Sequence, residues 1–219
     1  MKTISIISQK GGAGKTTLAL NLAGAAETFG HRSVIIDLDP QASAKGWHDH
    51  RQKESPVVIS AQASRLNDVL ATARQHGADI CIIDTAPHSE TAALAAARAA
   101  DLILIPCRAG ILDIRGISSS VDLAQLAKRP ALIVLNAVPP RGALADQAAE
   151  AIRPYGIDVA TTRISQRAAF YHSLTAGQTA VEFEPDGVAA QEIRALYQLA
   201  CKQAGMITGN KNHKEKKTA

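Results

Sequence analysis

The chain contains 219 residues, 46% of them hydrophobic, and carries a formal net charge of +4. This length fits one α/β domain with a complete hydrophobic core. No run approaches the roughly 18 consecutive apolar residues of a membrane-spanning helix, and the three widely spaced cysteines indicate neither a disulfide framework nor a zinc site.

The first predicted elements are a buried strand over Thr3–Ile7, a glycine-rich loop and a helix. The loop reads Gln9-Lys10-Gly11-Gly12-Ala13-Gly14-Lys15-Thr16-Thr17, and the apolar residues that follow it recur at helical spacing. A strand, a loop of this kind and a helix form the context that a phosphate-binding loop, or P-loop, requires. The loop departs from the general pattern in having Gln9 in place of glycine and a second lysine, Lys10.

The residues of this loop predict a site for a nucleoside triphosphate with Mg²⁺. Gly11, Gly12 and Gly14 can adopt backbone angles that turn successive amides toward phosphate oxygens, and the helix N-terminus adds partial positive charge. Lys15 would reach the β- and γ-phosphates. Thr16 would offer its hydroxyl to Mg²⁺, which needs only a few protein oxygens.

Two further predicted strands end in acidic residues. Ser33-Val34-Ile35-Ile36-Asp37-Leu38-Asp39-Pro40-Gln41 ends in two carboxylates, and Asp79-Ile80-Cys81-Ile82-Ile83-Asp84-Thr85-Ala86-Pro87 ends in one. Because ligands bind at the carboxyl edge of an open parallel sheet, Asp39 and Asp84 are predicted to meet at the phosphate and metal site. Each aspartate, taken alone, can also simply cap a following helix.

Strand-like and helical runs alternate along the whole chain, which predicts an α/β fold: a doubly wound, mostly parallel sheet with helices on both faces. Further strands are predicted over 56–60, 102–106 and 131–136, and helices near 64–76, 90–99, 113–127, 143–153 and 187–204. Apolar stripes on the helices over 113–127 and 187–204 indicate core faces. His48 and His50 flank Asp49, which is more typical of a solvated surface than of a metal site.

Two segments in the last third of the chain are basic. Arg163 and Arg167 flank the predicted entry to a helix. The segment over 161–171 resembles the one that carries DNA-contacting basic residues in the ParA/MinD group of ATPases. Because arginine suits backbone phosphates, the resemblance implies contacts to DNA of any sequence, although a solvated turn would carry the same residues. Residues 1–207 are expected to form the folded domain. Residues 208–219 are expected to form a disordered basic tail, which adds phosphate contacts or only keeps the chain soluble.

These motifs resemble the ParA/MinD group of deviant Walker ATPases, most of all its short ParA-type partition proteins. Lys10-Gly11-Gly12-Ala13-Gly14-Lys15-Thr16-Thr17 is similar to the deviant Walker A motif, Asp37-Leu38-Asp39-Pro40-Gln41 to Walker A′, and Ile82-Ile83-Asp84-Thr85-Ala86-Pro87 to the Walker B and switch segment. Leu104-Ile105-Pro106 with Leu112-Asp113 resembles the family's dimer-interface segment, and Leu135-Asn136 the strand end that contacts adenine. Ala86 departs from the more usual proline.

The resemblance implies roles for the matched residues. Lys10 would act in trans on nucleotide bound to the partner, so that ATP holds two protomers in a homodimer. Asp39 would orient or polarise the attacking water, Asp84 would hold Mg²⁺ through water, and Lys15 would neutralise charge on the transferring phosphoryl group. The ATP-binding residues implied in this way are Lys10, Gly11, Gly12, Ala13, Gly14, Lys15, Thr16, Thr17 and Asn136.

The predicted function is that of a partition ATPase. ATP-bound dimers would coat nonspecific DNA, and a centromere-binding ParB-type partner would stimulate hydrolysis, so that plasmid or chromosomal DNA is segregated. A cytoplasmic, nucleoid-associated protein without membrane contact is expected. The alternative is a MinD-like or other positioning ATPase acting on a membrane or a protein cargo, but Met206-Ile207-Thr208-Gly209 is too short for an amphipathic membrane helix. A P-loop metabolic kinase is disfavoured by Lys10 and by the Asp-x-Asp-Pro-Gln motif.

Overall fold

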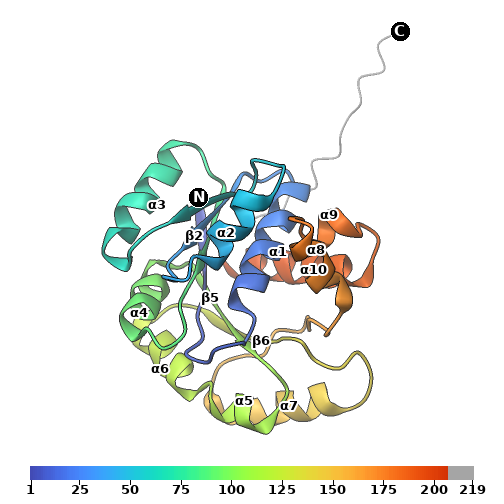
Figure 1. Ribbon diagram of the computed structural model, residues 1–219. Coiled ribbons are helices and arrows are strands. Elements are labelled where there is room, and N and C mark those ends of the chain that lie inside the picture. The colour runs from blue at the N-terminus through green and yellow to red at the C-terminus, as the bar shows by residue number, and fades with distance from the viewer. Residues whose placement is uncertain (207–219) are drawn as a thin grey trace.

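A computed structural model describes residues 1–206, which form one six-stranded parallel sheet between two layers of helices (Figure 1). The strand order is β3-β2-β4-β1-β5-β6. The strands are β1 (Lys2–Ile6), β2 (Ser33–Asp37), β3 (Val57–Ser60), β4 (Ile80–Asp84), β5 (Leu102–Cys107) and β6 (Ala131–Leu135). The predicted fold class and all six predicted strands are confirmed.

Each strand supplies side chains to both faces of the sheet because successive residues point in opposite directions. In β4, Ile80 and Ile82 belong to one hydrophobic core, and Cys81 and Ile83 belong to the other. This arrangement explains why β4 and β5 are apolar over nearly their whole length, whereas β1 alternates isoleucines with the buried polar residues Thr3 and Ser5.

The core that contains Ile82 is covered by helices from both ends of the chain, which lie together in Figure 1. These helices are α1 (Lys15–Thr28), α2 (Ser43–His50), α8 (Ala168–Thr175), α9 (Ala180–Phe183) and α10 (Val188–Gln203). The predicted helix over 187–204 is confirmed as α10, and the residues of its predicted stripe are buried. Helix α8 begins directly after Arg167, where the sequence predicted the entry to a helix, and α2 and α9 are additions to the predicted set.

The second core is covered by helices from the middle of the chain. They are α3 (Leu66–Gln75), α4 (Glu90–Ala99), α5 (Ile111–Arg115), α6 (Ser118–Ala127) and α7 (Leu144–Ile152), with 3₁₀ turns η1 (Ala63–Arg65) and η2 (Arg153–Tyr155). The single helix predicted over 113–127 is wrong in one respect: it is divided into α5 and α6. The division falls at Gly116, whose amide bonds back to Leu112 and Asp113 and which lies against the side chain of Lys10.

The expected basic tail over 208–219 lies outside the described residues, so its state and the domain boundary stay predictions. Within residues 1–206, no helix has the length and apolar character needed to cross a membrane.

Candidate nucleotide-binding site

The predicted site residues meet because the sheet aligns the carboxyl ends of three central strands. The register pairs Asp84 with Ile6 on one side and with Asp37 on the other. The P-loop that follows β1 therefore begins beside both acidic motifs. Thr85, directly after β4, links this strand to the end of β1 by donating a hydrogen bond from its hydroxyl to the carbonyl of Ile6 at 2.9 Å.

The P-loop has the geometry of an anion cradle. Gly12 and Gly14 have φ values of 73° and 92°, in the left-handed region that favours glycine. Within the described chain, the amides of residues 11–14 donate no hydrogen bond, and helix α1 begins directly after them. Free amides at the start of a 14-residue helix form a site for phosphate oxygens.

Asn136 holds the far end of the loop. Its amide nitrogen donates to the carbonyl of Ala13 at 2.7 Å, so its side-chain oxygen remains available as an acceptor. A side chain at Gly14 would collide with this amide, which makes glycine necessary there. The sequence prediction placed Asn136 at the nucleotide, and the structure brings it to the P-loop.

Lys15 lies beneath the loop and is only 7% exposed. Burial lowers the pKa of its ammonium group, while the nearby carboxylates of Asp84 and Asp39 act in the opposite direction. A buried lysine between free amides and two acids is arranged to neutralise an anion that enters the loop.

Lys10, the second lysine, is bound to helix α5. Its Nζ lies 2.7 Å from Oδ1 of Asp113 in α5. Nearby, α5 exposes two large apolar side chains, since Ile111 is 59% and Leu112 71% exposed. Lys10 is thus held at an open apolar edge rather than over its own P-loop.

Asp84 has the properties expected of a Mg²⁺ site. Both carboxylate oxygens are buried and accept no hydrogen bond from any described residue. Burial raises the pKa of this carboxyl to about 7, an effect that the neighbouring Thr16 hydroxyl and the charge of Lys15 reduce in part. Carboxylate and hydroxyl oxygens are ligands that Mg²⁺ accepts, and its bound water would satisfy the orphaned oxygens, so Asp84 and Thr16 fit this metal.

The two acids after β2 have different roles. Asp37 caps the start of α2, because its Oδ2 accepts hydrogen bonds from the amides of Ala44 and Lys45 and its Oδ1 accepts one from the amide of Asp39. Among the described residues, the carboxylate of Asp39 accepts only a local bond, from the amide of Gln41 at 2.9 Å. Capping of the following helix is therefore the role of Asp37 and not of Asp39.

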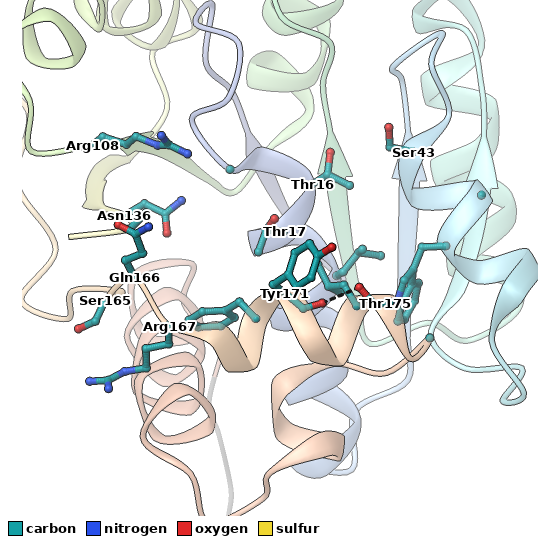
Figure 2. A pocket seen from close by; sticks show the side chains of 18 of the residues that line it. Thr16, Thr17, Ser43, Arg108, Asn136, Ser165, Gln166, Arg167, Tyr171 and Thr175 are labelled. Carbon is teal, nitrogen blue, oxygen red and sulfur yellow. Dashed lines mark hydrogen bonds between the residues drawn. The ribbon is translucent and has the colours of Figure 1, made fainter. Parts of the chain in front are cut away.

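A cleft of about 850 Å³ opens beside the P-loop. Figure 2 shows Asn136, Gln166 and Arg108 on one side of it, Thr16 and Thr17 in the middle and Ser43 on the other side. Asp39 does not line this cleft. It lies in a second hollow of about 1130 Å³, between the loop after β2 and the start of α4.

The two arginines predicted to contact DNA are both in ion pairs. The Nη2 atom of Arg163 lies 2.5 Å from Oδ1 of Asp146 in α7. Arg167 lies 2.9 Å from Glu192 of α10, and Glu192 also accepts hydrogen bonds from the amide and hydroxyl of Ser165. Arg167 therefore fastens this loop to α10, and phosphate contacts by either arginine stay a prediction.

The histidines after β2 do not form a metal site. His50 bonds to the carbonyl of Gly46, and residues 1–206 contain no group of three or more His, Cys, Asp or Glu side chains that could hold a metal ion together. Sequence reasoning missed Ser120, whose hydroxyl accepts a hydrogen bond from the amide of Gln9 at 3.1 Å, and Arg108 in the cleft wall. The only signal for Arg108 was its place directly after a buried strand.

Two relatives match the chain over most of its length. It is 27% identical to the maintenance of carboxysome distribution protein A of Halothiobacillus neapolitanus, over 89% of this chain and 94% of that protein. It is 24% identical to the chromosome-partitioning ATPase Soj of Thermus thermophilus, over 90% of this chain and 94% of that protein.

Solved structures have the same fold at low identity. An ATP complex of McdA from Cyanothece superposes with a TM-score of 0.76 and 18% identity, covering 94% of this chain and 97% of that one. The septum site-determining protein MinD of Pyrococcus horikoshii, in complex with Mg-ADP, gives a TM-score of 0.75 and 19% identity, covering 93% of this chain and 97% of that one.

The matched family domain spans residues 4–180, which include the P-loop, both acidic motifs and Asn136. The chain therefore belongs to the CobQ/CobB/MinD/ParA nucleotide-binding domain family.

Proposed function

We propose that this protein is a ParA-type positioning ATPase that binds ATP with Mg²⁺ in the P-loop cleft and hydrolyses it. The observation that carries this proposal is the combination of free loop amides, a buried Lys15 and an orphaned Asp84 at one sheet edge. Mg²⁺ would be held at Asp84 and Thr16, where it would offset phosphate charge. Asp39, which caps no helix, would orient the attacking water.

ATP would also control dimerisation. Lys10 stands at the edge where Ile111 and Leu112 are exposed, so a second copy packed there would cover apolar surface and bring Lys10 near the partner's phosphates. ATP would then be part of the interface, because Lys10, which pairs with Asp113 in the single protomer, would exchange that carboxylate for the partner's triphosphate.

The dimer would bind DNA without reading its sequence, and a partner protein would stimulate hydrolysis. Segregation of plasmid or chromosomal DNA, with a ParB-type partner, is the first candidate, supported by the similarity to Soj. Positioning of a protein compartment is the second candidate, supported by the similarity to the carboxysome distribution protein, which covers nearly the whole chain. A membrane-bound, MinD-like function would require preference for anionic vesicles over DNA.

The oligomeric state tests the shared part of this proposal. Light scattering of the Asp39→Ala protein, in which hydrolysis should be slow, should give a dimer mass with ATP and a monomer mass with ADP. Lys10→Ala in that background should remain monomeric with ATP while still binding nucleotide, since Lys15 and the loop amides are retained. Lys45→Ala, at a surface lysine paired with Asp49, is the matched control and should dimerise normally. Equal masses with ATP and ADP would refute ATP-controlled dimerisation.

A further inference from the structure

The cleft beside the P-loop is lined by two arginines and by no aspartate or glutamate. One of the two, Arg167, has its guanidinium paired with Glu192 at 2.9 Å. The other, Arg108, is exposed, and its guanidinium makes no ion pair or hydrogen bond with any residue from 1 to 206. The cleft thus presents a positive charge that no group within residues 1–206 neutralises.

The sheet places Arg108 between the two parts of the nucleotide site. It follows β5, which pairs with the P-loop strand β1 on one side and with β6, the strand before Asn136, on the other. The amide of Asn136 donates to the carbonyl of Cys107 at 2.8 Å, so Arg108 begins directly beside Asn136. In Figure 2 the guanidinium of Arg108 points into the cleft.

The other cations near the loop are already engaged. Lys10 is bound to Asp113 at 2.7 Å, and neither residue lines the cleft. Lys15 is buried under the loop, where Asp84 and Asp39 lie close enough to act on its pKa. A ligand whose phosphates rest on the P-loop and whose base extends toward Asn136 has to pass Arg108, whose forked donors suit phosphate oxygens.

We propose that Arg108 is a nucleotide-binding residue whose guanidinium contacts a phosphate of bound ADP or ATP from the same protomer. The proposal rests on the nucleotide site described above and adds a third cation to it. A contact within one protomer predicts that Arg108 acts in the ADP-bound monomer as well as in any ATP-bound dimer, in contrast to Lys10.

ADP binding by titration calorimetry tests the contact without dimerisation. Arg108→Ala should weaken ADP binding about tenfold, the effect of losing one charge-assisted hydrogen bond, and should make binding less sensitive to salt. Arg108→Lys should lose less because it keeps the charge. Arg115→Ala is the matched control: this arginine ends α5, is exposed and does not line the cleft, so ADP binding should be unchanged.

Adenosine, tested as a competitor of ADP, separates a phosphate contact from a base contact. Its affinity should be the same in Arg108→Ala and the unmodified protein. An unchanged ADP affinity in Arg108→Ala, or an equal loss for adenosine and ADP, would overturn the assignment. Failure of the unmodified protein to bind ADP at all would instead refute the proposed nucleotide site.

Discussion

The carboxylate of Asp84 is buried without a partner, which is a costly state for the nucleotide-free protein. Its pKa is raised from 3.8 to about 7, so the folded state favours the protonated form. A carboxyl with a raised pKa leaves stability intact at low pH and reduces it as pH rises from the unfolded pKa to the folded one. The destabilisation of the folded state by the Asp84 charge should therefore grow between about pH 4 and pH 7.

Asp84→Asn should remove this destabilisation, because the amide carries no charge. At pH 8, without nucleotide, the variant should be more stable than the unmodified protein by about 1–3 kcal/mol, and the difference should shrink as pH falls toward 4. Thermal unfolding across this pH range measures the effect. Mg²⁺-dependent turnover should fall at the same time, because the neutral amide no longer attracts the cation. A variant that is less stable at every pH would contradict the assigned burial cost.

Residue identity alone predicted the acidic motifs but not which of their carboxylates caps a helix. The order Asp37, Leu38, Asp39 does not say which carboxylate caps a helix, because Asp37 ends β2 and Asp39 comes only two residues later. Asp37 became the cap because α2 begins where its oxygens can accept two helix amides. That position depends on the path of the chain after β2, which the sequence pattern did not determine.

At the scale of elements, the long apolar strands and stripes were predictable and the short helices were not. Helix α2 has eight residues, among them Gly46, His48 and His50, which are weak helix formers, so its sequence carries little helical signal. It is stabilised instead by the Asp37 cap and by the buried side chain of Trp47. Helix α9 has only four residues, although its Thr179–Glu182 capping box was a readable signal.

One ion pair joins these short elements. Arg51, directly after α2, has a side chain only 1% exposed, stacks on the ring of Trp47 and pairs with Glu182 of α9 at 3.0 Å. Burial alone would raise the pKa of Glu182, but hydrogen bonds from Thr179 and Lys53 and the charge of Arg51 together lower it. This pair stabilises the fold above the ordinary pKa of glutamate and less so as pH falls below it.

Glu182→Gln should destabilise the protein by about 3 kcal/mol, because it leaves the Arg51 charge buried without a partner. Denaturant unfolding at pH 7 measures the loss. Glu184→Gln, at an exposed glutamate at the end of the same helix, should change stability by no more than about 0.5 kcal/mol. Equal stability of the two variants would show that the pair does not hold α2 and α9 together.

At the scale of the whole molecule, the sheet edge that holds the nucleotide site is also the edge that exposes α5. Lys10 lies on this edge between the P-loop and Asp113, so nucleotide state and the surface offered to a second copy are structurally connected. Arg163 and Arg167 lie in the loop that leads into α8, where they pair with α7 and α10, and Arg167 also lines the nucleotide cleft. Bound DNA would have to compete with those intramolecular pairs.

The ATP-bound dimer should bind DNA of unrelated sequences with similar affinity, because phosphate contacts carry no sequence information. Each arginine would have to exchange a carboxylate partner for phosphate, so Arg163→Ala with Arg167→Ala should weaken DNA binding by about 1–3 kcal/mol and reduce the salt slope by up to about 2 per protomer. Removing residues 208–219 should have a smaller effect. Anisotropy titrations at two salt concentrations measure both quantities.

The control for this experiment is Arg153→Ala, which removes an exposed arginine paired with Glu150 and should leave DNA affinity unchanged. Because Arg167 also fastens its loop to α10, thermal unfolding of the double variant must show that the fold persists. A folded double variant with unchanged affinity and salt slope would show that these arginines serve only their ion pairs. Stronger binding to anionic vesicles than to DNA would favour a membrane-positioning function, since the cationic surface would then act on lipid headgroups.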